Sequence, residues 1–223
     1  MIVRYWMKDE VSTVEPTTSL LEAHERMRKH KVRRLPVVEA GRVVGILSRS
    51  DLQRYLTPLE AKGSASVGIE ESLAGRSVRD EMTTSPTTCP LNTPLEDAGA
   101  TMRERKIGAI PVVDRKDRLV GIITESDVLA ALAAITKGGP NTSRVTLRLA
   151  SGREGGPEGI EHELAHIVAI AARHGVEIRT FITHELPDEG GILTLRAAAS
   201  DARIESFLDD LREQNFELLD LRH

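Results

Sequence analysis

An internal repeat constrains the fold of this chain more than any other feature of its sequence. When the sequence is aligned with itself so that Met7 meets Met82, further matches follow in the same order over the first two thirds of the chain. One inserted residue near Lys116-Asp117 shifts the later matches by one position. The matched stretches are Pro36-Val37-Val38 with Pro111-Val112-Val113, Val44-Gly45-Ile46 with Val120-Gly121-Ile122, and Ser50-Asp51 with Ser126-Asp127. A repeated unit usually packs against its copy to bury a face that neither buries alone, so the repeat predicts a tandem pair of similar modules.

Each copy predicts the element order β-α-β-β-α. The first copy has a β-like run at 11–14, a helix capped by Thr18, strands at 34–39 and 42–48, and a helix from Ser50-Asp51. The second copy has a β-like run at 87–89, a helix capped by Thr93, strands at 109–114 and 119–124, and a helix from Ser126-Asp127. Hydrophobic spacing and turn residues support these elements. A stretch rich in Gly, Ser and Ala, from Thr57 to Arg76, is expected to connect the copies.

Two strings carry a resemblance to a known family. They are Leu35-Pro36-Val37-Val38 followed by Gly45-Ile46-Leu47-Ser48-Arg49-Ser50-Asp51, and Ile110-Pro111-Val112-Val113-Asp114 followed by Gly121-Ile122-Ile123-Thr124-Glu125-Ser126-Asp127. Because both occur at matching offsets, residues 1–136 resemble the tandem cystathionine-β-synthase (CBS) domain pair, or Bateman module. The resemblance implies a regulatory adenosyl ligand, such as AMP, ADP, ATP or S-adenosylmethionine, bound in the clefts of the pair.

The residue chemistry at the strand-to-helix corners agrees with that role. A strand that ends at Ser48 or Thr124 and opens a helix presents a hydroxyl and free backbone N–H groups, which favour phosphate. Asp51 and Asp127 follow in the first helical turn, where a carboxylate can accept both hydroxyls of a ribose. The alternative is that each Asp only caps the helix and stabilises its dipole.

The predicted ligand-binding residues differ between the copies. In the first copy they are Thr13, Val32, Arg33, Arg34, Leu35, Pro36, Ser48, Arg49 and Asp51, and in the second Thr88, Ile107, Gly108, Ala109, Ile110, Pro111, Thr124, Glu125 and Asp127. The small apolar stretch at 107–110 admits a flat adenine, whereas the arginines of the first copy attract phosphate. We therefore expect two non-equivalent clefts. The alternative to ligand binding is that Thr13 and Thr88 are simply exposed threonines that favour a β conformation. For Arg33 and Arg34, the alternative is a solvated, charged loop.

The C-terminal third predicts a different domain. Strands at 144–150, 176–185, 191–199 and 216–222, with helices at 160–174 and 202–214, give the order β-α-β-β-α-β, which is ferredoxin-like. This order resembles an ACT domain, a small regulatory module that often binds amino acids at a dimer interface. The loop Gly155–Gly159 departs from the Asp-x-Pro-Gly pattern of such sites, which favours a dimerisation role over amino-acid binding. A CBS pair followed by an ACT-like domain is similar to acetoin-utilisation-type regulatory proteins.

The predicted fold class is therefore mixed α+β, in three domains. The domains are a CBS-like unit at 1–61, a second CBS-like unit at 77–136 and an ACT-like domain at 144–223, joined by linkers at 62–76 and 137–143. The C-terminal domain also holds a zinc-protease string, His162-Glu163-Leu164-Ala165-His166. Helical spacing places Leu164 with Ile160, Ile167 and Val168 on the buried face, so the two histidines are expected at its flank. A zinc hydrolase is the minor alternative.

Composition limits the other possibilities. Aromatic residues make up only 3% of the 223 residues, which argues against a base-stacking nucleic-acid surface. A formal net charge of −4 gives no general attraction to nucleic acids or anionic membranes. The single cysteine, Cys89, excludes a disulfide within the chain and fits a reducing, cytoplasmic location. We therefore expect a cytoplasmic, homodimeric ligand sensor rather than an enzyme, with a purely structural dimerisation module as the alternative.

Overall fold

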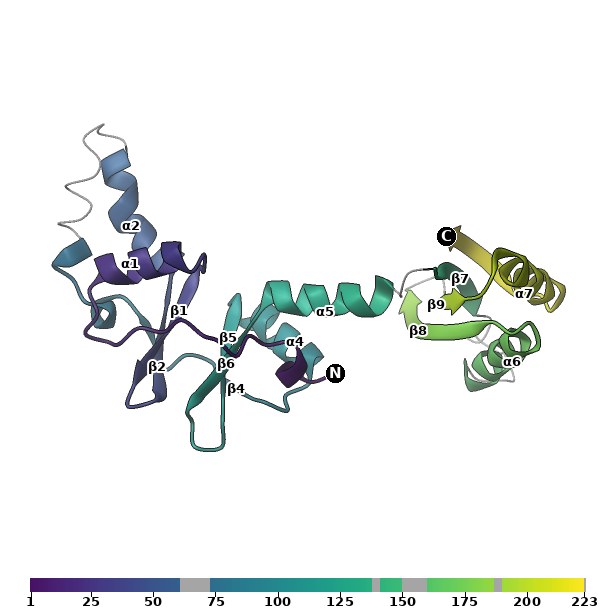
Figure 1. The fold of residues 1–223 in the computed structure, drawn as a ribbon, viewed down its shortest axis with the longest axis horizontal. Helices are drawn as coiled ribbons and strands as arrows, with labels where there is room; N and C mark the ends of the chain where they lie inside the picture. The colour runs from purple at the N-terminus through teal and green to yellow at the C-terminus, as the bar shows by residue number, and fades with distance from the viewer. Residues whose placement is uncertain (61–72, 138–140, 150–159, 187–189, 223) are drawn as a thin grey trace. The chain divides into compact units, whose positions relative to one another are not determined.

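The computed structural model describes residues 1–60, 73–137, 141–149, 160–186 and 190–222. Its elements form two compact units, Met1–Ala131 and Leu132–His223 (Figure 1). The division falls within one helix, α5 (Glu125–Lys137). The predicted mixed α+β fold class is confirmed, because both units combine helices with β-sheets.

The first unit contains two three-stranded sheets, one for each copy of the repeat. The first copy contains α1 (Leu20–Lys29), β1 (Arg34–Glu39), β2 (Arg42–Ser48) and α2 (Arg49–Glu60), and its third strand is β3 (Thr83–Thr84). The second copy contains β4 (Cys89–Pro90), α4 (Leu95–Arg105), β5 (Ala109–Val113), β6 (Leu119–Thr124) and α5 (Glu125–Lys137). Single 3-10 turns lie at Val3–Tyr5 and Val78–Asp80. The hairpins β1-β2 and β5-β6 thus confirm the core of the predicted repeat.

Several predicted element ends are wrong by a few residues. Ser19, not Thr18, caps α1, because the Ser19 hydroxyl accepts the N–H of Glu22 at 3.1 Å while the Thr18 hydroxyl accepts the N–H of Glu15. Pro94, not Thr93, precedes α4. The helix α2 begins at Arg49 and continues to Glu60, through the start of the predicted connection. Within the run predicted at 11–14, the structure has an isolated bridge, from Val14 to Val37. The predicted linker residues 62–72 lie outside the described residues.

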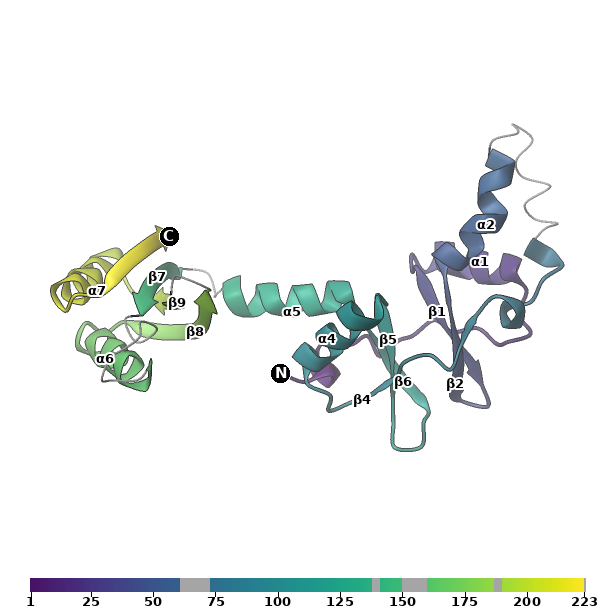
Figure 2. The ribbon, with the colours of Figure 1, turned by 180° about the vertical axis from the view of Figure 1, so that it is seen from behind.

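Each copy completes its packing with the segment that precedes the other copy. Val3 is fully buried in the core of the second copy, and Lys8 exchanges two backbone hydrogen bonds of 2.9 Å with Ile122 on β6. Figure 2 shows this purple start of the chain beside α4. Conversely, Leu73 and Val78 are buried in the core of the first copy, and β3 pairs with β2. The two copies are therefore one interdigitated body.

Two glycines allow these exchanged segments to approach the sheets. A methyl group on Gly121 of β6 would lie 2.5 Å from Sδ of Met7 and 3.0 Å from the carbonyl oxygen of Lys8. In the first copy, a methyl group on Gly45 of β2 would likewise clash with Sδ of Met82. The matched Met7-Gly121 and Met82-Gly45 pairs are thus the same contact made twice.

The second unit is a four-stranded antiparallel sheet with two helices. Its elements are β7 (Ser143–Leu149), α6 (Ile160–Arg173), β8 (Glu177–Leu186), β9 (Gly190–Ala198), α7 (Asp201–Glu213) and β10 (Glu217–Arg222). The strand order β10-β7-β9-β8 and the order of elements confirm the ferredoxin-like prediction. Both helices cover one face of the sheet, where Ile167 and Phe207 pack against alternate residues of β7 and β9 (Figure 1).

Some predictions for this unit are corrected or lie outside the described residues. Val168 was expected on the buried face of α6 but is 47% exposed, and Ile170 takes a buried place instead. The glycine-rich loop at 151–159, linker residues 138–140 and turn residues 187–189 are outside the described residues. Within the described part of the chain, no helix has the length and hydropathy needed to cross a bilayer.

The Met7-Gly121 contact gives a test of the interdigitated core. We expect Gly121→Ala to lower the free energy of unfolding by about 1–3 kcal/mol, because the added methyl group overpacks the sheet against Met7. In the Gly121→Ala/Met7→Ala double variant, the penalty should be smaller than the sum of the single penalties by about 1 kcal/mol. Chemical denaturation of the original protein, the two single variants and the double variant measures this coupling. Strictly additive penalties would contradict the contact.

The turn between β5 and β6 gives a pH-dependent prediction. Asp114 accepts the backbone N–H of Arg118 at 3.0 Å and its Nε at 2.8 Å, and these bonds, the backbone one first, lower the pKa of the carboxyl to about 2. Because the folded pKa lies below the unfolded value, the stabilisation is complete above about pH 4 and is lost as the pH falls towards 2. We expect Asp114→Asn to lower the urea midpoint at neutral pH, by an amount that shrinks as the pH falls through this window. A constant difference at every pH would contradict the assignment.

Candidate functional site

A pocket of about 270 Å³ opens between the two copies of the repeat in the first unit. The first copy contributes Arg34, Ile46, Ser48, Ser50 and Asp51. The second copy and its preceding segment contribute Thr83, Ser85, Pro86, Thr87, Lys106, Ile107, Gly108 and Ala109. The pocket therefore depends on the pairing of the copies, because neither copy supplies both walls.

The corner between β2 and α2 forms the polar side of this pocket. Oδ2 of Asp51 accepts the backbone N–H of Ser48 and its hydroxyl, both at 2.7 Å, and the N–H of Asp51 returns to the Ser48 hydroxyl at 3.3 Å. The Ser48 and Ser50 hydroxyl oxygens are 2.7 Å apart. This reciprocal network is the capping role given above as the alternative for Asp51. It also fixes the carboxylate and two hydroxyls at the pocket wall.

The second copy repeats the corner with similar geometry. Oδ2 of Asp127 accepts the N–H of Thr124 at 2.9 Å and its hydroxyl at 2.5 Å, and the N–H of Asp127 donates to that hydroxyl at 3.3 Å. Thr124 and Asp127 are half-buried, and Glu125 is exposed. These residues do not line the pocket described above, so the two equivalent corners lie in different surroundings.

The pocket gathers predicted residues from both copies. Arg34, Ser48 and Asp51 of the first copy meet Ile107, Gly108 and Ala109 of the second. Sequence reasoning had associated each corner with the strand start of its own copy, but the Ser48-Asp51 corner faces the small apolar segment of the other copy. The reason is the interdigitated packing, which places the second hairpin opposite the first.

The other ligand-binding residues predicted in the hairpins and beside them lie outside this pocket. Leu35 and Ile110 are core residues at 0% and 1% exposure, and Pro36 and Pro111 are buried. Val32 packs on the first core. Arg33 and Arg49 are exposed, and their backbones are joined by a 2.8 Å hydrogen bond.

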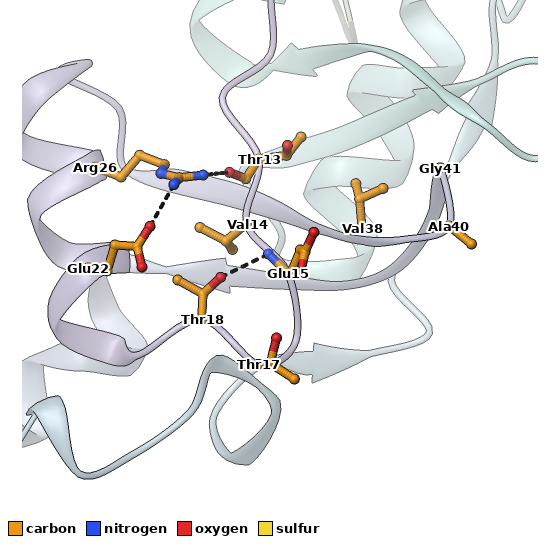
Figure 3. Close-up of a pocket in the computed structure, with 10 residues that line it drawn as sticks. All are labelled: Thr13, Val14, Glu15, Thr17, Thr18, Glu22, Arg26, Val38, Ala40 and Gly41. Carbon is orange, nitrogen blue, oxygen red and sulfur yellow. Dashed lines mark hydrogen bonds and ion pairs between the residues drawn. The ribbon is translucent and has the colours of Figure 1, made fainter.

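The two predicted threonines also lie elsewhere. Thr13 lines a separate polar pocket on the first copy, where its carbonyl accepts Nη1 of Arg26 at 2.5 Å and Arg26 also pairs with Glu22 (Figure 3). Thr88 is exposed, whereas its neighbour Thr87 lines the pocket between the copies. Sequence reasoning missed Thr87 and the segment before it. That segment has no clear periodicity, so no sequence signal placed it at the cleft.

The zinc-protease string lies on α6 of the second unit. His162 is exposed, and the half-buried His166 ring packs edge-to-face against Phe216, with centroids 5.7 Å apart. Glu163 is half-buried beside half-buried Leu164. Over the described ranges, no group of three or more His, Cys, Asp and Glu side chains is arranged to hold a metal ion. The contact with Phe216 gives His166 a packing role.

Comparison with known proteins assigns the first unit. The family model for the CBS domain matches residues 3–58 and 77–134. The chain belongs to the CBS domain family. The match ends at residue 134, and the ACT-like and acetoin-utilisation relationships of the C-terminal domain remain predictions.

Individual relatives share the CBS region. Protein MJ1225 of Methanocaldococcus jannaschii is 31% identical over 140 residues, 59% of this chain and 49% of that protein, so the chain spans about half of this relative's length. The crystal structure of MJ1225 gives a TM-score of 0.51 over 59% of this chain and 48% of that one, at 30% identity. The structure of CBSX2 of Arabidopsis thaliana in complex with AMP gives a TM-score of 0.50, at 33% identity over 60% of this chain and 97% of that one.

An enzyme also shares part of the chain. Inosine-5'-monophosphate dehydrogenase of Aquifex aeolicus is 30% identical over 169 residues, which are 74% of this chain but only 30% of the enzyme. A match to so small a part of that enzyme does not transfer its activity. Relatives that match as CBS domain-containing proteins include CBSX1 of Arabidopsis thaliana, at 30% identity over 59% of this chain and 63% of that protein.

Proposed function

We propose that this protein is a regulatory sensor that binds an adenine nucleotide or another adenosyl ligand in the pocket between its CBS copies. The observation that carries the proposal is the meeting of the Ser48-Asp51 corner with the small apolar segment Ile107–Ala109 in one pocket. The complex of the related CBSX2 with AMP supports the same ligand class. AMP, ADP, ATP and S-adenosylmethionine are the compounds to be tested.

The pocket offers a suitable group for each part of such a ligand. Ile107 and Ala109 provide apolar surface for the flat adenine. Asp51 has two carboxylate oxygens with about four acceptor positions, so its bonds to Ser48 leave capacity for ribose hydroxyls. Ser48 and Ser50 lie at the start of α2, where the helix dipole favours a phosphate.

Ligand binding at a wall shared by both copies provides a means of regulation. A ligand shifts the protein between arrangements only if its affinity differs between them. We propose that the two copies change their relative arrangement on binding, and that the ferredoxin-like domain acts as an ACT-like dimerisation or effector domain in a cytoplasmic homodimer. The buried thiol of Cys89, the only cysteine, is consistent with a reducing compartment. An amino acid bound at the C-terminal domain would be a further regulatory input.

The competing function is a structural pair that binds no ligand. The hydrogen bonds of Asp51 and Asp127 to their own corners favour it, because they give both carboxylates a role in holding the fold. The two functions differ in their response to ligand, since a compound that binds only the folded state raises its melting temperature.

Equivalent substitutions at the two corners test the sensor function. We expect AMP to raise the melting temperature of the protein and Asp51→Ala to weaken AMP binding at least 10-fold in isothermal titration, because this substitution removes the ribose acceptor. Asp127→Ala is the matched control, since it removes the same capping bonds outside the described pocket. The sensor proposal fails if none of the four compounds shifts the melting temperature, or if Asp51→Ala, Asp127→Ala and the double variant all bind as the original protein does.

A further inference from the structure

The pocket between the CBS copies contains the positively charged side chain of Arg34, which reaches from the first copy to the wall formed by the second. Arg34 begins β1 and lies opposite Ser48 in the register of the β1-β2 hairpin. Its side chain is half-buried and extends over Gly108 of the second copy, where a methyl group on that glycine would lie 2.8 Å from the guanidinium carbon. The guanidinium of the first copy is therefore held at the small apolar wall of the second.

Further charged residues surround this guanidinium. Lys106 also lines the pocket, and it ends α4 in the left-handed conformation with φ 54°. Asp51 brings a negative charge, and its carboxylate is held by two hydrogen bonds from Ser48. Glu125 brings a second carboxylate to within 2.9 Å of the same methyl position on Gly108, from an exposed site where solvent screens its charge. Arg34 and Lys106 are the cationic side chains that line this pocket and face a ligand's anionic group.

We propose that this pocket selects adenosyl ligands by charge, and that Arg34 is the specificity-determining residue. This inference rests on the proposed function. A guanidinium forms short, charge-assisted and often bidentate hydrogen bonds with phosphate oxygens. It repels the sulfonium cation of S-adenosylmethionine and gains nothing from uncharged adenosine. The ligand class is therefore the adenine nucleotides, bound more tightly than adenosine or S-adenosylmethionine.

The glycine at position 108 is part of this arrangement. A side chain there would occupy the space of the guanidinium and displace it, although the flexible end of Arg34 can move without disrupting the fold. Gly108→Ala is therefore expected to act like a loss of Arg34 function rather than a loss of folding. It provides a second variant in which Arg34 is present but displaced.

Titration with AMP, adenosine and S-adenosylmethionine tests the inference. We expect the original protein to bind AMP at least 10-fold more tightly than the other two compounds, with a preference that falls as salt is raised. Arg34→Met should reduce the preference over adenosine to within about threefold while adenosine affinity stays within about twofold. Arg34→Lys should keep part of the preference, and Gly108→Ala should weaken it. Arg33→Met is the matched control, because the adjacent Arg33 is exposed and does not line the pocket.

The outcomes separate this inference from the function on which it rests. If none of the three compounds binds, the proposed function fails. If adenosine or S-adenosylmethionine binds the original protein as tightly as AMP, the sensor remains and charge selection is wrong. An equal loss of AMP and adenosine affinity in Arg34→Met would also overturn the inference, because it would assign Arg34 a role in shaping the pocket instead.

Discussion

The exchange of short segments between the two CBS copies is the contact on which the rest of the first unit depends. Lys8 pairs with Ile122 of the second copy, and Thr83-Thr84 pairs with β2 of the first. Burial of Val3 and Val78 secures the two segments in opposite cores. Because each core is completed by residues from beyond its own copy, the pair forms a single packed body. The pocket walls, which come from both copies, are brought together by this packing.

The Ser48-Asp51 corner combines a structural role with the proposed ligand role in the same atoms. The Asp51 carboxylate satisfies the strand-end N–H of Ser48 and is thereby held at the pocket wall. Such preorganisation lowers the ordering cost of binding, since the acceptor is in place before the ligand arrives. Asp127 is held in the same way, but in other surroundings. Equivalent corners can therefore differ in function through the residues that the opposite copy presents to them.

The sequence predicted the regular elements better than their combination. The hairpins at 34–48 and 109–124 were found because their alternation and turn residues are local signals, as was the ferredoxin-like order of the C-terminal domain. The exchanged segments are too short and irregular to show a period, so their destination depends on long-range packing. One signal did exist: the match of Met7 with Met82 reflects their equivalent contacts with Gly121 and Gly45. Without the paired arrangement, Arg34 could be assigned only to its own copy.

The exchange also imposes an order on synthesis. The residues around Val3 are made more than a hundred residues before their pairing partner on β6, Ile122, and their core neighbour Ile123. Until then the first copy can close its hairpin, but the apolar segment around Val3 has no permanent site and stays available to chaperones or to wrong partners. The two-copy body is therefore completed only after the second copy is made, with the segment around Val3 among the last parts to be secured.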